Sequence, residues 1–181
     1  MITLLLLMPL FLLTTFPDGT QCNDSLWNHV YHSYRLQILN SCVQATGIID
    51  EIRVEKDGDY HIRIHLDNNY TNLLNDVNIS RQGGDLVVEP ICIHEVTQQD
   101  AIRSCSDYSS NLVIPPIGTH VIISGSWVTD TLHGWNEIHP LSQIIPYTAT
   151  PEFPIVEIMF VLGLFGGLIL LGLFYRLEYK K

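Results

Sequence analysis

Histidine and carboxylate side chains at alternating positions are the residues of this chain best suited to chemistry. His61 and His65 occur in one alternating segment, and Trp135, Glu137 and His139 occur in another. Every second side chain of a strand lies on the same face, so each set shares a face. His61 and His65 would lie about 13–14 Å apart, too far to bind one ion by themselves. A mixed nitrogen and oxygen metal site therefore needs Glu137 and His139 with a histidine from another strand.

The same residues are also typical of polar strand faces that hold no ligand. Arg63 lies between the two histidines and would repel a cation. The sequence has no His-Glu-x-x-His motif and no Gly-x-Ser-x-Gly motif, and Gly83-Gly84 is not followed by the lysine of a phosphate-binding loop. We therefore predict no enzymatic activity and no cofactor. A metal-dependent hydrolase that uses the His/Glu cluster is the alternative.

Alternation of apolar and polar residues predicts five strands that would position these side chains. The first two form a hairpin around Lys56-Asp57-Gly58-Asp59, a typical turn sequence. The last two form a second hairpin around Thr131-Leu132-His133-Gly134. The expected strands are residues 42–55, 60–66, 86–88, 120–128 and 135–139.

A helix is expected between the third and fourth strands. The Thr97 hydroxyl can cap its first turn, and Ala101, Ile102 and Cys105 would share one face. Three strands, a helix and two strands is the element order of an OB-fold. We predict a mainly β domain over residues 22–146, an OB-fold-like barrel of five strands with one short helix. A small β-sandwich is the alternative.

The apolar residues are concentrated at the two ends of the chain. Residues 2–13 have the length of a signal-peptide core, so we predict a signal peptide over residues 1–21, with a retained anchor as the alternative. Residues 155–175 predict a transmembrane helix, and the basic residues of the tail 176–181 mark its cytoplasmic side. We expect a single-pass protein of the cell membrane whose N-terminal domain is extracytoplasmic.

The charge of the chain restricts its partners. Asp and Glu number 19 against 9 Lys and Arg, which gives a formal net charge of −10. OB domains often bind single-stranded nucleic acid in a basic groove. An acidic surface repels phosphate backbones, so nucleic acid is not expected as a partner, and a single-stranded nucleic-acid-binding OB domain is kept only as an alternative.

Four cysteines in a domain that is expected outside the cytoplasm predict disulfides rather than thiol metal ligands. Of the three possible pairings we favour Cys22 with Cys42 and Cys92 with Cys105, which are the local ones. Three Asn-x-Ser/Thr triplets give glycosylation acceptors at Asn23, Asn69 and Asn78.

Two resemblances add to these patterns. Pro151, Glu152, Phe153 and Pro154 precede the apolar segment and the basic tail. This order resembles the PEF-type C-terminal sorting signal of archaeal surface proteins, which implies processing by an archaeosortase-type enzyme and makes residues 147–154 a linker. The run from residue 27 to 144, with Gly-Trp-Asn-Glu-Ile-His-Pro at 134–140, resembles a group of uncharacterised secreted bacterial and archaeal proteins.

These observations together predict where the protein works more than what it binds. We expect a cell-surface or membrane-anchored binding or assembly protein with a protein or glycan ligand. Candidate ligand-binding residues are His61, His65, Trp135, Glu137 and His139.

Overall fold

The computed structural model describes residues 22–148, which form a mainly β structure with five strands and a few short helices. The predictions of a mainly β fold and of five strands are confirmed. Of these, residues 22–147 belong to one compact unit. The strands are β1 (Leu36–Val54), β2 (Tyr60–Leu66), β3 (Leu86–Val88), β4 (His120–Asp130) and β5 (Asn136–Pro146).

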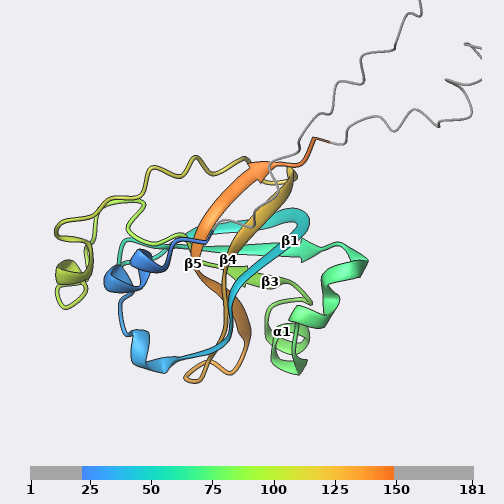
Figure 1. Ribbon diagram of the computed structural model, residues 1–181, viewed down its shortest axis with the longest axis horizontal. Helices are drawn as coiled ribbons and strands as arrows, with labels where there is room; N and C mark the ends of the chain where they lie inside the picture. Colours follow the sequence, from blue (N-terminus) through green and yellow to red (C-terminus); the bar gives the residue numbers. More distant parts are fainter. Residues whose placement is uncertain (1–21, 149–181) are drawn as a thin grey trace, which may run out of the picture. The chain divides into compact units, whose positions relative to one another are not determined.

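The five strands close into a ring of hydrogen-bonded neighbours in the order β1-β2-β3-β5-β4, with β4 paired again to β1 (Figure 1). The length of β1 makes this closure possible. Its last part, from Gly47 to Val54, pairs with β2, and its first part, from Leu36 to Ile48, pairs with β4. All neighbours are antiparallel except β3 and β5, which are parallel.

Two glycines allow backbones to approach closely inside this ring. A Cβ atom at Gly47 would lie 2.4 Å from the carbonyl oxygen of His65, and one at Gly125 would lie 2.5 Å from that of Pro140. Both distances are far below ordinary van der Waals contact. Each glycine therefore lies where β1 or β4 crosses its neighbour without room for a side chain.

Inward-facing aliphatic side chains from all five strands fill the ring. Ile62 and Ile64 come from β2 by the alternation that the sequence predicts, and each is completely buried. A second, smaller cluster packs around Ile91 and Val128. The other members of the main core are Ala45, Ile49, Leu66, Leu73, Leu86, Val88, Val121, Ile123, Ile138, Leu141 and Ile144.

The sequence predicted a helix between the third and fourth strands, and this prediction of its position is wrong. Between β3 and β4 the structure has only a 3₁₀ turn, η4 (Ile102–Cys105). Thr97 does not cap it: the backbone amides of Thr97 and Gln98 both donate to Lys56 O, at 2.8 Å, which ties the segment to the β1–β2 turn. The α-helix of the domain is α1 (Asp76–Arg81), between β2 and β3, and Asn75 caps its first turn. The remaining 3₁₀ turns are η1 (Asp24–His29), η2 (Ser33–Arg35) and η3 (Asn68–Leu73).

Two strands are longer than the sequence suggested, for physical reasons. β1 begins at Leu36 because its first residues pair with β4, although their exposed side chains carry no alternating pattern. β5 continues past Pro140 to Pro146, because the register against β4 shifts beside Gly125. A proline can be accommodated at such an irregularity, where no ladder hydrogen bond is required.

Both disulfide predictions are confirmed. Cys22 bonds to Cys42, 20 residues apart, and Cys92 bonds to Cys105, 13 residues apart. The first attaches the N-terminal segment to β1, and the second closes the loop between β3 and η4. Arg35 forms an ion pair with the buried Asp130, with Arg35 Nε 3.1 Å from Asp130 Oδ2.

Candidate functional site

Four of the five candidate ligand-binding residues come together in the structure. His61 lies on β2, Glu137 and His139 lie on β5, and Trp135 immediately precedes β5. Glu89 joins them, because its carboxylate oxygens lie 3.1 Å from His61 Nδ1 and 2.9 Å from His139 Nδ1. We refer to five of the side chains gathered here, Asp59, His61, Glu89, Glu137 and His139, as the acid–imidazole network.

The structure does not place His65 in this network. The His65 side chain is 72% exposed, and its Nδ1 lies 3.2 Å from Asp85 Oδ1. Arg63 also behaves differently from the expectation that it would repel a cation. It lies 3.1 Å from Asp50 Oδ2 and 2.6 Å from Glu51 Oε2, so two carboxylates neutralise its charge.

Strand pairing explains why Glu89 lies between two histidines. Ile62 of β2 is opposite Val88 of β3, so the residues next to them, His61 and Glu89, are also opposite each other. On the other side, Val88 pairs with Ile138 of β5, and Glu89 N donates to Ile138 O at 2.9 Å. Backbone pairing alone therefore places Glu89 between β2 and β5, independently of its side-chain contacts.

Glu137 is held at both carboxylate oxygens. Trp135 Nε1 donates to Glu137 Oε2 at 2.8 Å, and Glu137 Oε1 lies 3.1 Å from His139 Nδ1. These contacts agree with the interpretation that alternate residues of this strand share a face. Glu137 and His139 are each only 1% exposed. His139 Nε2 is buried and has no hydrogen-bond partner among the described residues.

Burial and the charges of neighbouring side chains shift the pKa values of individual network residues in different directions. Burial opposes a charge on His139, but Glu89 and Glu137 outweigh it and raise the pKa of His139 well above its usual value. Burial would likewise raise the pKa of Glu89, but His139 and His61 outweigh it and hold that pKa well below its usual value. Burial, followed by the charge of Glu89, raises the pKa of Glu137. Glu89 is therefore the ionised carboxylate that both imidazoles share.

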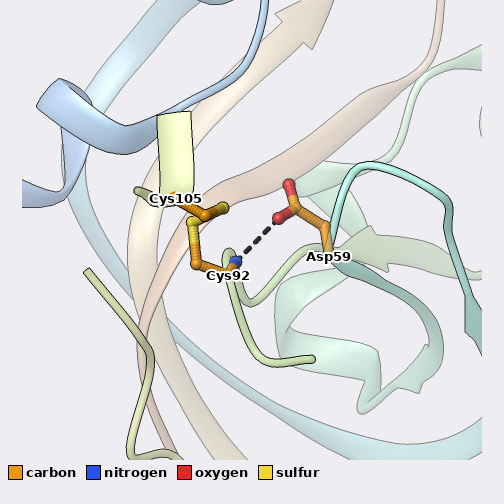
Figure 2. A group of neighbouring side chains, drawn as sticks. All are labelled: Asp59, Cys92 and Cys105. Carbon is orange, nitrogen blue, oxygen red and sulfur yellow. Dashed lines mark hydrogen bonds between the residues drawn. A yellow bond between two sulfur atoms is a disulfide. The ribbon is translucent and has the colours of Figure 1, made fainter. Parts of the chain in front are cut away.

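Asp59 completes the network from the β1–β2 turn. Its carboxylate accepts a hydrogen bond from Cys92 N at 2.8 Å and points toward the Cys92–Cys105 disulfide (Figure 2). Asp59 is 4% exposed, and this burial raises the pKa of its carboxyl to about 8. The two sulfur atoms near Asp59 are bonded to each other, so they are not thiolates that could bind a metal ion.

A pocket of about 520 Å³ opens above the network. Asp59, His61 and Glu89 face it from the network, and the Trp135 side chain forms part of its wall. The Trp135 ring stacks on His133, with the two ring centroids 4.4 Å apart. The rest of the lining is polar or charged and consists of Arg35, Glu51, Arg53, Glu55, Asp57, Arg63, Arg81, Gln82 and His133.

The arginines around this pocket are not equivalent. Arg35 is paired with Asp130, Arg53 lies 3.5 Å from Glu51, and Arg63 also contacts Glu51. Arg81, in the last turn of α1, is exposed and makes no ion pair within residues 22–148. It is therefore the guanidinium group of the pocket that is available to a ligand.

Sequence reasoning missed Glu89 and Asp59 as site residues. Glu89 directly follows a very short strand, and Asp59 was assigned to a turn. Neither belongs to an alternating His/Glu pattern, and their positions depend on which strands pair. The strand order of an OB-fold, which also joins the third strand to the second and the fifth, was the signal that could have placed Glu89 between His61 and His139.

The predicted glycosylation sites differ in their access. Asn23 and Asn69 are exposed. Asn78 is completely buried, and its amide nitrogen donates to Asp85 O and Asn136 O, so the folded domain does not present it for modification.

The predicted signal peptide, most of the linker, the Pro-Glu-Phe-Pro motif and the C-terminal helix lie outside the described residues. Within residues 22–148, no helix has the length and apolar character needed to cross a membrane.

Comparisons with known proteins do not add to this geometry. No family model matches the chain, and neither a curated protein nor a solved structure matches it. The proposals below are therefore drawn from the residues and their geometry.

Proposed function

We propose that the protein is an extracytoplasmic binding protein that takes a small zwitterionic ligand, such as an amino sugar acid, into the pocket above the acid–imidazole network. The observation that carries this proposal is the lining of the pocket, in which free groups of both charges surround a tryptophan wall. A pocket of about 520 Å³ has the usual volume of a small-molecule site.

The charged groups of the rim suit a ligand that carries both signs. Arg81 offers an unpaired guanidinium group, which can bind a carboxylate through two parallel hydrogen bonds. Glu55 and Asp57 line the same pocket and make no ion pair among the described residues. They can bind an ammonium group. Trp135 supplies a flat apolar surface against which a sugar ring can pack.

We further propose that the domain has an OB-fold and that it is held at the cell surface. The ring order β1-β2-β3-β5-β4 and the parallel β3–β5 pair support the OB-fold. Two disulfides support an oxidising location. The apolar ends of the sequence support a signal peptide and a membrane anchor, processed by an archaeosortase-type enzyme.

Cell fractionation tests the location. We expect the chain in the membrane fraction after a high-salt wash and in the soluble fraction after detergent, because an apolar helix or lipid is not removed by salt. Its four cysteines should react with maleimide only after reduction. Recovery as a cytosolic protein with reactive thiols would contradict the proposed location.

Calorimetric titration of the full-length, chelator-treated chain in mild detergent tests the ligand class. Muramic acid carries both charges, whereas glucosamine and glucuronic acid carry one each, so we expect the first to bind most tightly. Arg81→Ala should weaken binding by roughly 10- to 150-fold, because a charge-assisted hydrogen bond contributes roughly 1.5–3 kcal/mol. Arg103→Ala is the matched control, since Arg103 is also exposed but lies on η4 outside the pocket. Equal losses in the two variants, or no binding of any probe, would refute the proposal.

A further inference from the structure

Three side chains of the network approach one another as the ligands of a metal ion do. Asp59, Glu89 and His139 each offer one ligand atom, and these atoms lie within 4.8 Å of one another. Ligand atoms bound to one ion at about 2.1 Å lie up to about 4.2 Å apart, so small side-chain rotations would bring the three into a coordination sphere.

The side chain of His139 provides a second, independent indication of a metal ion. Its Nδ1 is engaged by Glu89 Oε2 and Glu137 Oε1, at 2.9 and 3.1 Å. Its Nε2 is buried and has no partner within the part of the chain that the structure describes. A buried polar atom without a partner is costly to leave unsatisfied, and a metal ion would satisfy this one. When an ion binds Nε2, the Glu89 carboxylate leaves Nδ1 to become its ligand, and Glu137 Oε1 stays on Nδ1, which is the usual arrangement of a metal-binding histidine.

The surroundings of His139 fix the orientation that a metal ligand needs. Glu137 accepts from Trp135 Nε1 through one oxygen and contacts His139 Nδ1 through the other, so the carboxylate cannot rotate freely. His61 contacts Glu89 Oε1 in the same way from β2. Each expected ligand except Asp59 is thus held by a further side chain, and Asp59 is held by Cys92 N.

The charges of the pocket also favour a cation. Glu55 and Asp57 lie along the pocket that leads to the network. Three of the four arginines there are in contact with carboxylates of their own. A cation that enters the pocket therefore meets the carboxylates of Glu55 and Asp57, which make no ion pair among the described residues, before it reaches Asp59 and Glu89.

We propose that Asp59, Glu89 and His139 bind one divalent transition-metal ion on the floor of the pocket, with Glu137 as the carboxylate that positions His139. One imidazole and two carboxylates suit Zn²⁺ or Mn²⁺ better than Ca²⁺, which prefers oxygen ligands alone. The sequence suggested Glu137 and His139 with another histidine as ligands. The geometry instead makes Glu137 a positioning residue and brings in Asp59 and Glu89. Three protein ligands leave open positions toward the pocket, where a bound ligand or water can reach the ion.

Metal titration of the full-length, chelator-treated chain tests this site. We expect one Zn²⁺ or Mn²⁺ per chain by calorimetry and by elemental analysis after desalting, with weaker binding of Ca²⁺. Asp59→Asn and Glu89→Gln should each lower Zn²⁺ affinity by more than roughly 100-fold, because they remove a ligand charge. Glu137→Gln should lower it by roughly 10–100-fold, the usual effect of losing a partner of a ligand.

Asp67→Asn is the matched control for these variants. Asp67 Oδ2 lies 2.9 Å from His120 Nε2, so it is a carboxylate paired with a histidine, but it does not line the pocket. The Zn²⁺ affinity of the Asp67→Asn variant should equal that of the unmodified chain. Equal losses in Asp67→Asn and Glu89→Gln would refute the site, because the effect would then be one of general charge.

The unmodified chain gives a result that does not depend on any variant folding. If it binds neither Zn²⁺ nor Mn²⁺ stoichiometrically, the metal site is refuted. The site goes beyond the proposed zwitterion binding and can fail separately from it, because the sugar titration uses chelator-treated protein. The metal-dependent hydrolase that the sequence left as an alternative would require this ion, whereas binding of the ion does not require hydrolysis.

Discussion

Asn78→Ala is expected to destabilise the domain by about 4 kcal/mol, because it leaves several buried backbone groups without partners at once. The Asn78 side chain is completely buried. Its amide nitrogen donates to Asp85 O at 3.1 Å and to Asn136 O at 2.8 Å. Its carbonyl oxygen accepts from Asn75 N at 3.1 Å and from Asn136 N at 2.9 Å. One side chain thereby joins α1 to the residue before β3 and to the first residue of β5.

The same change should also disturb the pocket. Arg81 lies in the last turn of α1 and Gln82 is its C-cap, and both line the pocket. When Asn78 no longer attaches α1 to β5, these two residues lose their fixed position. We therefore expect weaker binding of the zwitterionic probe even where Asn78→Ala remains folded.

Urea-induced unfolding measures the predicted loss of stability. Asn69→Ala is the control, because Asn69 is in another Asn-x-Ser/Thr triplet but is exposed. The free energy of unfolding of this variant should differ from that of the unmodified chain by less than about 0.5 kcal/mol. Asn78→Asp keeps the shape and one acceptor but turns a carboxylate toward two carbonyl oxygens, so it should also destabilise. An Asn78→Ala protein within about 1 kcal/mol of the unmodified chain would show that the four bonds contribute little.

Local sequence patterns were sufficient to predict those features of the structure that depend on residues close together in the chain. The alternation of Tyr60–Leu66 predicted the buried face of β2, and Gly58, at φ 100°, occupies the turn that the sequence assigned to it. Glu137 and His139 lie on one face for the same reason. The two disulfides followed from the even number of cysteines and their local spacing.

The sequence was not sufficient to predict those features that depend on contacts between segments far apart in the chain. Glu89 acquires its two imidazole partners only because β3 lies between β2 and β5. The segment after Thr97 has a helical pattern, but its amides bond to Lys56 O, and the Cys92–Cys105 disulfide holds its far end. α1 was missed because its buried residue, Asn78, is polar and was therefore expected at the surface. In each case tertiary contacts outweighed the local preference.

Removing the Cys92–Cys105 disulfide is expected to cost about 3 kcal/mol of stability, through the greater freedom of the unfolded chain. The double change Cys92→Ser with Cys105→Ser removes the disulfide without leaving a free thiol. The double change Cys22→Ser with Cys42→Ser should cost a similar amount, because the loops are of comparable length, 13 and 20 residues. Thermal or urea unfolding of the two variants measures these costs.

The two variants should differ at the site. Cys92 N donates to the Asp59 carboxylate, so the Cys92–Cys105 disulfide holds the loop that orients Asp59 (Figure 2). The Cys22–Cys42 disulfide lies outside the pocket lining. Once both proteins are folded, the Cys92/Cys105 variant should bind Zn²⁺ at least about tenfold more weakly, as expected when a support of a metal ligand is lost, whereas the Cys22/Cys42 variant should bind it normally. Equal Zn²⁺ affinities in two folded variants would show that the loop does not need its disulfide to orient Asp59.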